Sequence, residues 1–204
     1  MGMNIVAISG KLTSGKSTLA NNIVKVDSSY RVVPLAYPLK QAIAELCGTS
    51  LEFMREHKDK FRPILQYYGT DIMRWLYGED IWVERLFEYA YNLDLQHLIV
   101  DDVRYPNEVE GLANRADKFM SVRLLINTDD QIQRYHSLYG EFISLEKLNH
   151  RSETALDTYT DFDMVVRPNM PLDLLTDQVL AGMNRRSMTE FAALPQELIG
   201  VQPS

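Results

Sequence analysis

Several features are scarce in this sequence, and each scarcity narrows the class of protein. Among 204 residues there is a single cysteine, Cys47, which excludes an internal disulfide framework and a zinc site built from cysteines. We expect Cys47 to be a small core residue. No apolar run approaches the length that spans a membrane, and the strand-like pattern at the N-terminus leaves no targeting segment. We therefore expect a soluble, cytoplasmic protein with no membrane partner.

Basic residues are also scarce, since 21 Lys and Arg stand against 28 Asp and Glu, giving a formal net charge of −7. Because binding to a nucleic-acid backbone needs clustered Lys and Arg, we expect no nucleic-acid partner. The chain has no internal repeat and no low-complexity segment. Its hydrophobic content of 46% is typical of a globular domain with a full core.

The chain is organised around the stretch NIVAISGKLTSGKSTLA, residues 4–20. Its apolar start predicts a strand, and residues 10–17 match G-x-x-x-x-G-K-[ST], the pattern of a phosphate-binding loop that precedes a helix. Glycines without a Cβ let the N–H groups of the loop wrap a polyphosphate, and the helix directs its positive end at the same anion. Lys16 adds a mobile charge, and Ser17 offers a hydroxyl to Mg²⁺.

The motif predicts that a nucleoside triphosphate, taken here as ATP, binds at this loop. The residues expected to contact it are Gly10, Lys11, Thr13, Ser14, Gly15, Lys16, Ser17 and Thr18, with Arg167 after the last strand. The motif by itself does not separate a kinase from a switch or a motor.

Apolar runs and helical periodicity alternate along the chain. Strands are predicted at residues 5–8, 31–36, 96–102, 119–126 and 162–166, and helices at 38–46, 51–57, 63–77, 79–92, 107–114, 129–139 and 171–184, with Ser50 and Thr128 as caps. This order predicts a three-layer α/β fold, a central parallel sheet of about five strands with helices on both faces. We expect the first strand at the centre and the second, with Pro34, at an edge. Residues 1–185 are expected to form one domain, followed by a tail at 186–204.

In such a sheet, ligands bind beyond the carboxyl ends of the strands, and Asp101, Asp102 and Arg104 follow the third strand. An acid at a strand end is placed to meet Mg²⁺ or its water shell. Strand alternation allows only one of the two aspartates to face it. Arg104 can make a two-pronged contact with a phosphate. The alternative is a solvated acidic loop that caps the next helix.

Two further segments offer groups that suit an acceptor. The helix from residue 62 has a broad apolar stripe, expected in the core, and a separate polar stripe with Gly69 beside it. The apolar stripe is Leu65, Tyr68, Ile72, Trp75 and Leu76, and the polar stripe is Arg62, Gln66 and Thr70. The polar groups suit a phosphate and a base edge, although an ordinary wet helix face has the same pattern. After the second strand, Lys40 is a candidate for an acceptor phosphate and Tyr37 for a base, with a plain surface lysine as the alternative.

The segment from residue 131 to 156 is polar and poorly periodic in its second half. An enzyme that transfers a phosphoryl group must exclude water, and a mobile lid with arginines does this while stabilising charge. Arg134 and Arg151 are the candidates for that role. His150 is expected to be a lid or surface residue, because the other histidines are distant in sequence and no cysteine accompanies them.

Five short motifs occur in order between residues 3 and 166. They are residues 10–17, Tyr37-Pro38-Leu39-Lys40, Gln66-x-x-Gly69-Thr70-Asp71, Asp102-x-Arg104-x-x-Asn107-Glu108 and His150-x-Ser152-Glu153. The ordered set resembles bacteriophage-type deoxynucleoside monophosphate kinases, within the wider nucleoside monophosphate kinase group. The resemblance implies a P-loop kinase that uses ATP and Mg²⁺ to convert a dNMP into a dNDP, in the host cytoplasm if viral. It also implies a helical region that binds the monophosphate, at about 37–78, and a lid at about 131–158.

The resemblance further implies roles for individual residues. The catalytic residues would be Lys16, Asp102, Arg104, Arg134 and Arg151. Ser17 and Asp102 would hold Mg²⁺. Asp102 is preferred to Asp101 because it matches the strand-end acid of the family better. The acceptor site would contain Tyr37, Lys40, Arg62, Gln66, Gly69, Thr70, Asp71, Arg104, Asn107, Glu108, His150 and Glu153.

Two other functions remain open. Residues 150–153 also resemble a segment of phosphomevalonate kinases, whose acceptor is not a nucleotide. A base-stacking aromatic in the pocket would favour a nucleotide, and Tyr37, Tyr67, Tyr68 and Trp75 are the candidates. The other alternative is a non-catalytic nucleotide-binding protein, against which stand the many Lys and Arg outside the loop. The base, the sugar and the oligomeric state, including a homodimer, are left open.

Overall fold

The computed structural model describes residues 2–167 and 170–192. Its centre is a sheet of five parallel strands in the order β2-β3-β1-β4-β5. The strands are β1 (Asn4–Gly10), β2 (Arg31–Val32), β3 (His97–Val103), β4 (Lys118–Leu124) and β5 (Met164–Val166). The predicted α/β class, the five-stranded parallel sheet, the central first strand and the edge position of the second strand are confirmed.

Every connection between consecutive strands contains at least one helix, and a last helix follows β5. The helices are α1 (Lys16–Val26), α2 (Tyr37–Leu46), α3 (Leu51–Glu56), α4 (Lys58–Gln66), the π-helical segment η1 (Tyr67–Arg74), α5 (Trp75–Tyr77), α6 (Ile81–Asn92), α7 (Pro106–Ala113), α8 (Thr128–Tyr139), α9 (Leu145–Asn149), α10 (Arg151–Thr154) and α11 (Leu172–Ala192). Within the described ranges, no helix combines the length and the apolar character that crossing a membrane requires.

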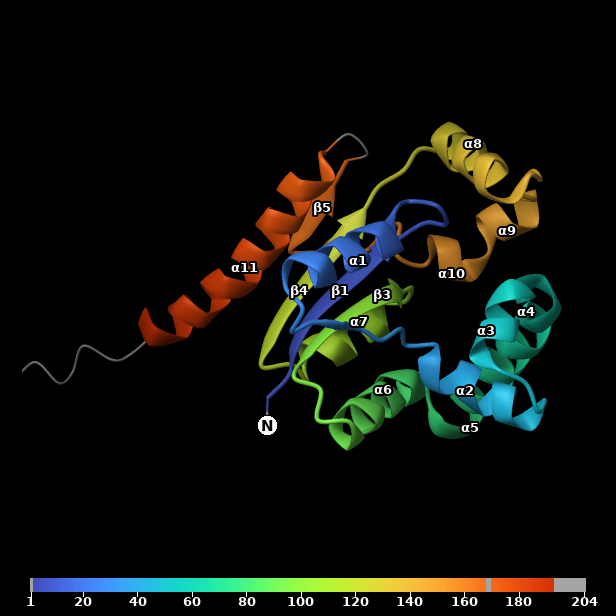
Figure 1. Cartoon of the computed structure of the whole chain (residues 1–204), viewed down its shortest axis with the longest axis horizontal. Coiled ribbons are helices and arrows are strands. Elements are labelled where there is room, and N and C mark those ends of the chain that lie inside the picture. The colour runs from blue at the N-terminus through green and yellow to red at the C-terminus, as the bar shows by residue number, and fades with distance from the viewer. Residues whose placement is uncertain (1, 168–169, 193–204) are drawn as a thin grey trace, which may run out of the picture.

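Alternation along the central strand divides the core into two layers. Ile5 and Ala7 pack in one layer with residues of α6 and α7, whereas Val6 and Ile8 pack in the other with residues of α1 and α11. All four side chains are at most 2% exposed, and Figure 1 shows the sheet between these helices. Because both faces of β1 are covered, its apolar run is continuous rather than alternating.

Two groups of helices lie beyond the carboxyl ends of the strands, α2–α5 on one side and α8–α10 on the other (Figure 1). The first group has a small core of its own, in which Leu39 and Ile43 of α2 pack with Met54 of α3 and Trp82 of α6. These groups occupy the segments in which the sequence predicts the acceptor region and the lid.

The helix predicted at residues 63–77 is longer and less regular than expected. It begins at Lys58 with Pro63 inside it, and its backbone widens into a π-helix over Tyr67–Arg74. Because a π turn contains more residues than an α turn, the side chains that follow are rotated from the positions that an α-helical period gives. Trp75 and Leu76 are 80% and 54% exposed, so their predicted place in the core is wrong.

Several smaller predictions are also corrected. Cys47 is exposed at the end of α2 instead of buried in the core. The second strand has only two residues, because Pro34 has no N–H to extend the ladder. Asn127, rather than Thr128, caps α8, since its side chain accepts the backbone N–H of Asp130. The irregular segment contains α9 and α10, and α11 continues to Ala192, into the expected tail. The rest of that tail lies outside the described residues.

The two tryptophans of the chain provide a test of the helix in which the sequence pattern failed. Replacing Trp82, which is 7% exposed and donates to Gly69 O at 2.9 Å, by alanine should lower the free energy of unfolding by about 3–5 kcal/mol. Replacing Trp75 by alanine should change it by less than about 0.5 kcal/mol, because the side chain lies in solvent. Urea unfolding measures both values, and a loss of several kcal/mol for Trp75→Ala would contradict the π-helical arrangement.

Candidate active site

The phosphate-binding loop connects β1 to α1 and has the backbone that its glycines require. Gly15 has φ of 99°, in the left-handed region that favours glycine, and Thr13 adopts φ of 63°. At Gly10 the constraint is space, because a Cβ there would lie 2.8 Å from the carbonyl oxygen of Leu124 in the neighbouring strand. The loop therefore packs its first glycine directly against β4.

Two polar groups of the loop fit a polyphosphate. The hydroxyl of Ser14 is buried and has no hydrogen-bond partner among the described residues. Lys16 Nζ donates to the carbonyl oxygens of Gly10 and Lys11, at 2.7 and 2.9 Å. Burial, with a contribution from the nearby charge of Arg104, lowers the pKa of Lys16 to about 8. A desolvated cation and an orphaned hydroxyl in one loop are the groups that phosphate oxygens would satisfy.

The aspartates at the end of β3 point in different directions, as alternation predicts. Asp101 Oδ2 accepts a hydrogen bond from Ser17 Oγ at 2.8 Å. The carboxylate of Asp102 instead accepts the backbone N–H groups of Leu35 and Ala36, at 2.7 and 3.1 Å. The structure thus brings Asp101, and not the predicted Asp102, to Ser17, because Asp101 lies on the face of β3 that α1 covers.

Ser17 and Asp101 together have the chemistry of a Mg²⁺ site. Both offer oxygen, which hard divalent cations prefer, and Mg²⁺ typically takes one or two protein groups while phosphates and waters supply the rest. No cluster of three or more His, Cys, Asp or Glu residues suited to a metal ion occurs in the described part of the chain. A metal at Ser17 and Asp101 would therefore depend on the phosphate oxygens of a bound nucleotide.

Burial raises the pKa of Asp101, and the neighbouring charge of Asp102 adds to this effect. Lys16 and Lys40 act on Asp101 in the opposite direction, so Lys40 lies within electrostatic reach of the site. A cation beside Ser17 would favour the ionised form of Asp101.

Arg104 is held between two carboxylates. Its guanidinium pairs with Glu153 of α10 and donates to Ser152 O at 3.2 Å, while its backbone N–H donates to Glu108 Oε2 at 2.7 Å. Burial alone would lower the pKa of Arg104, but the charges of Glu153, Asp102 and Glu108 outweigh burial and raise the pKa. The loop shares this network, since Leu12 N donates to Glu153 Oε2 at 2.6 Å.

Glu108 has a different place from the one expected of a substrate-binding residue. It is 4% exposed, caps the start of α7 through Arg104 N and Tyr105 N, and pairs with Arg74 at 2.6 Å. Burial raises its pKa, against the opposing effect of these hydrogen bonds and of Arg74. Arg74 is buried at the end of η1 and stacks over Tyr105, 4.8 Å from the ring centre. Arg74 was missed in the sequence analysis, although it lies four positions after Thr70, the last residue of the predicted polar stripe.

Other predicted acceptor residues are tied to the protein itself. Asn107 Nδ2 donates to Glu79 O and Asp80 Oδ1, at 3.2 and 2.9 Å. The ring of Tyr37 packs against Tyr89, with 4.9 Å between centres, instead of flanking an open pocket. Gly69 lets α2 approach closely, because a Cβ there would lie 2.6 Å from a methyl carbon of Leu39. The side chains of Arg62, Gln66, Thr70 and Asp71 lie outside the described part of α4 and η1.

The predicted lid residues divide into two sets. Arg134 reaches the loop, with Nη1 3.5 Å from Thr13 O, and Thr13 Oγ1 donates to Gln131 O in the same helix at 3.2 Å. Arg151 is exposed and lies over Tyr105 at 5.5 Å, and His150 is exposed. Arg167 is exposed after β5. The hydrogen bonds of Lys16 are to loop carbonyl oxygens and do not involve these four described side chains, so their roles stay predictions.

A second charged cluster beside the loop was missed by the sequence reasoning. Arg123 of β4 donates to Ser9 Oγ at 2.9 Å and pairs with Asp157 at 2.8 Å. Asp157 also pairs with Lys11 of the loop at 2.9 Å. Burial lowers the pKa of Arg123, although the charge of Asp157 acts to raise it. The available signal was a charged residue inside the apolar strand segment Met120-Ser-Val-Arg-Leu124.

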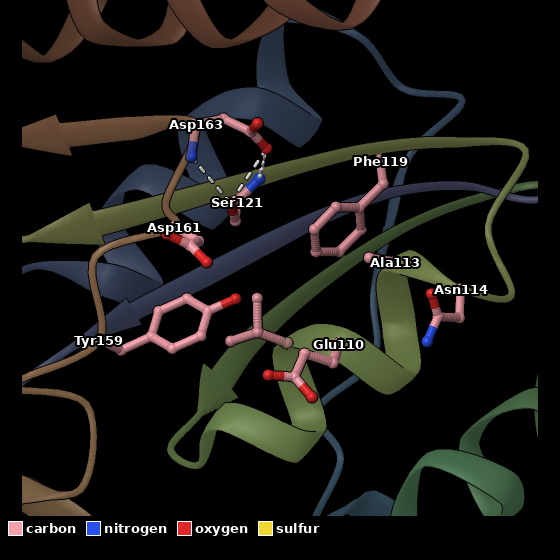
Figure 2. Close-up of a pocket in the computed structure, with 9 residues that line it drawn as sticks. Glu110, Ala113, Asn114, Phe119, Ser121, Tyr159, Asp161 and Asp163 are labelled. Atoms are coloured by element: carbon pink, nitrogen blue, oxygen red, sulfur yellow. Dashed lines mark hydrogen bonds between the residues drawn. The ribbon is translucent and has the colours of Figure 1, made fainter.

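A separate pocket of about 340 Å³ lies between α7, β4 and the segment before β5 (Figure 2). Its lining includes the carboxylates of Glu110, Asp161 and Asp163 and no basic residue. Asp163 accepts hydrogen bonds from the backbone and hydroxyl of Ser121. Because three carboxylates repel a polyanion, this pocket does not suit a phosphate, and the loop is the candidate nucleotide site.

Comparisons with known proteins agree with the fold. No protein-family model matches the sequence, and no curated protein is similar enough in sequence to count as a match. A solved gluconokinase from Sinorhizobium meliloti 1021 is 19% identical, with a TM-score of 0.56 over 94% of this chain and 98% of that chain. A sugar kinase from Janibacter sp. is 15% identical, with a TM-score of 0.57 over 89% and 95%. A Thermus thermophilus protein is 17% identical, with a TM-score of 0.52 over 96% and 100%.

The fold is that of the P-loop kinases. At identities below a fifth, this likeness concerns the arrangement of the chain, and it confirms the predicted fold class. The acceptor has to be argued from the site, because one fold supports many substrates.

Two matched variants should distinguish the role of Asp101 from that of Asp102. Asp101→Asn should remove the increase in nucleotide affinity that Mg²⁺ provides, and it should not lower stability, because burial disfavours the charge at this position. Asp102→Asn should lower the free energy of unfolding by about 1–3 kcal/mol, because it weakens the acceptor for two backbone N–H groups. Calorimetric titration with and without Mg²⁺ and urea unfolding give the two readouts. The reverse assignment of effects would restore Asp102 as the metal-side acid.

The lowered pKa of Lys16 predicts how nucleotide binding depends on pH. Below its pKa of about 8 the ammonium is charged and attracts the triphosphate, and above it ATP must bind together with a proton. The dissociation constant for ATP should therefore rise from about pH 7.5 to about pH 9.5, by up to about tenfold per pH unit. Lys16→Arg, which stays charged, should bind more weakly but with a flatter profile. Parallel profiles for the two proteins would show that another group titrates.

Proposed function

We propose that this protein is an ATP-dependent kinase whose acceptor is a deoxynucleoside monophosphate. The observation that carries the kinase assignment is the convergence of charges on Lys16. Arg104, Glu153, Asp101 and Asp102 all act on this one side chain, and they come from two separate segments, the end of β3 and α10. A simple nucleotide-binding loop has no need of an arginine held beside it by a glutamate that also contacts the loop.

The residues divide the work of phosphoryl transfer, which depends on positioning and charge stabilisation. The loop N–H groups and Ser14 would hold the phosphates of ATP, and Lys16 would follow the transferred group. Ser17 and Asp101 would hold Mg²⁺, which neutralises charge on the β- and γ-phosphates when bound. Arg104, positioned by Glu108, would stabilise the transferred phosphoryl group from the acceptor side. Arg134, next to Thr13, and Arg151 would complete a lid that excludes water.

The nucleotide acceptor is supported by the ordered motifs and by the placement of α2–α5 beside Arg104. Lys40 of α2 is within electrostatic reach of Asp101 and can meet an acceptor phosphate. Of the four candidate stacking aromatics, Tyr37 packs on Tyr89, and Trp75 and Tyr67 are 80% and 60% exposed, so Tyr68 is left. Another small-molecule acceptor, such as phosphomevalonate or a sugar acid, is the alternative that this scarcity of stacking groups favours.

The proposal is tested by coupled ADP release with ATP, Mg²⁺ and a panel of dNMPs, NMPs, phosphomevalonate and gluconate. We expect turnover on one or more dNMPs. Turnover only on phosphomevalonate or gluconate would keep the kinase and replace the acceptor. ATP binding without ADP release on any acceptor would point to a binding protein.

The variant Lys16→Met tests whether the phosphate-binding loop is the catalytic site. Removing the charge that follows the transferred group should lower kcat at least about a hundredfold, and the thermal midpoint should not fall, because the lysine is desolvated in the fold. Turnover of this variant at the wild-type rate would exclude the loop as the catalytic site.

A further inference from the structure

The segment around α10 is docked on the phosphate-binding loop at several points. Leu156 is 2% exposed within the core layer of α6 and α7, so the end of the expected lid is anchored. Asp157 pairs with Lys11 at 2.9 Å and with Arg123 at 2.8 Å. Glu153, four residues earlier, accepts from the loop N–H of Leu12 at 2.6 Å. The carboxylates of Glu153 and Asp157 thus bind two adjacent residues of the loop, Lys11 and Leu12.

Glu153 makes contacts that resemble those of a bound anion. One carboxylate oxygen accepts a loop N–H, and the other pairs with the guanidinium of Arg104. A loop N–H together with an arginine is the donor set that phosphate-binding sites use for a phosphoryl oxygen. The Glu153 side chain is 8% exposed, whereas its partner Arg104 is 30% exposed, so the carboxylate is buried against a guanidinium that solvent can still reach.

The contacts of Lys16 also indicate that groups of the protein itself occupy the phosphate-binding part of the loop. Its ammonium is turned onto the carbonyl oxygens of Gly10 and Lys11, and Glu153 acts on it electrostatically. The groups expected to hold the outer phosphate of a triphosphate are therefore all engaged by the chain itself. The hydroxyl of Ser14, deeper in the loop, has no such partner among the described residues.

We infer that Glu153 is an internal phosphate mimic, which occupies the outer phosphoryl position of the loop and must leave it when a polyphosphate binds. Binding then exchanges the Glu153 contacts at Leu12 N and Arg104 for phosphate oxygens, and α10 undocks. The exchange couples nucleotide binding to movement of the lid and frees Arg104 to meet the transferred group. This inference deepens the proposed function and rests on it for the role of the site, but its test needs neither an acceptor nor turnover.

The first test is calorimetric titration of the full chain with pyrophosphate, without metal. Glu153→Gln removes the competing charge, so it should bind pyrophosphate about tenfold more tightly than the wild type, because the competent fraction of the loop rises. Glu146→Gln is the matched control, an exposed glutamate in α9 whose loss makes the same change in net charge. Its affinity should equal that of the wild type.

High salt separates competition at the site from long-range attraction. Screening removes the effect of a distant charge, so the ratio of affinities between Glu153→Gln and the wild type should persist in high salt. Equal or weaker binding by Glu153→Gln, or a ratio that vanishes in high salt, would overturn the inference.

The second test uses the wild type alone and decides the matter if Glu153→Gln does not fold. Amide hydrogen exchange in residues 150–157 should become several-fold faster on saturation with pyrophosphate, while exchange in the loop slows. Slower exchange in both segments would mean that Glu153 stays docked beside the ligand, and it would overturn the inference. Either result stands apart from the kinase assignment, because a chain that binds pyrophosphate without transferring phosphate would show the same exchange.

Discussion

The parallel pairing of β1 with β3 on one side and β4 on the other is the constraint on which the site depends. The register brings Ser9 level with Val103 and Gly10 level with Leu124. Because the three strands run in one direction and end together, the loop after β1 opens beside the charged residues that follow β3. The contact of Gly10 with Leu124 O then fixes the first residue of the loop to the sheet.

Charge is concentrated at this edge by pairing, in a chain whose net charge is negative. Arg74 is held by Glu108, Arg104 by Glu153, and Arg123 by Asp157. A guanidinium taken out of water needs such a partner, and a buried pair contributes more to orientation than to stability. Each of these arginines is therefore fixed in direction, which suits a reaction whose rate depends on positioned charge.

The same pairing shows how a site for polyanions can exist in a folded protein before a polyanion is bound. Arginines and free N–H groups gathered around a loop repel one another and lack partners, so the chain supplies carboxylates of its own. Glu108 is buried and structural, whereas Glu153 lies between the loop and Arg104, where its contacts are those a phosphate would take. The difference between a permanent and a replaceable partner follows from their contacts, since Glu108 also caps α7, whereas the Glu153 carboxylate contacts only the loop and Arg104 among the described residues.

The sequence by itself determined the phosphate-binding loop, the central place of β1 in a parallel sheet and the edge at which the site lies, because glycine spacing and apolar periodicity are local properties of the chain. It did not determine which of Asp101 and Asp102 faces Ser17, since alternation gives two faces and only the packing of α1 on one of them makes the choice. It placed Trp75 in the core because an α-helical period was assumed, and the π-helix that rotates Trp75 into solvent is held by contacts with α2 and α6. Arg74 and Arg123 each left a signal in the sequence, but their partners did not, because Glu108 and Asp157 lie 34 residues away in sequence and only the tertiary structure brings them together.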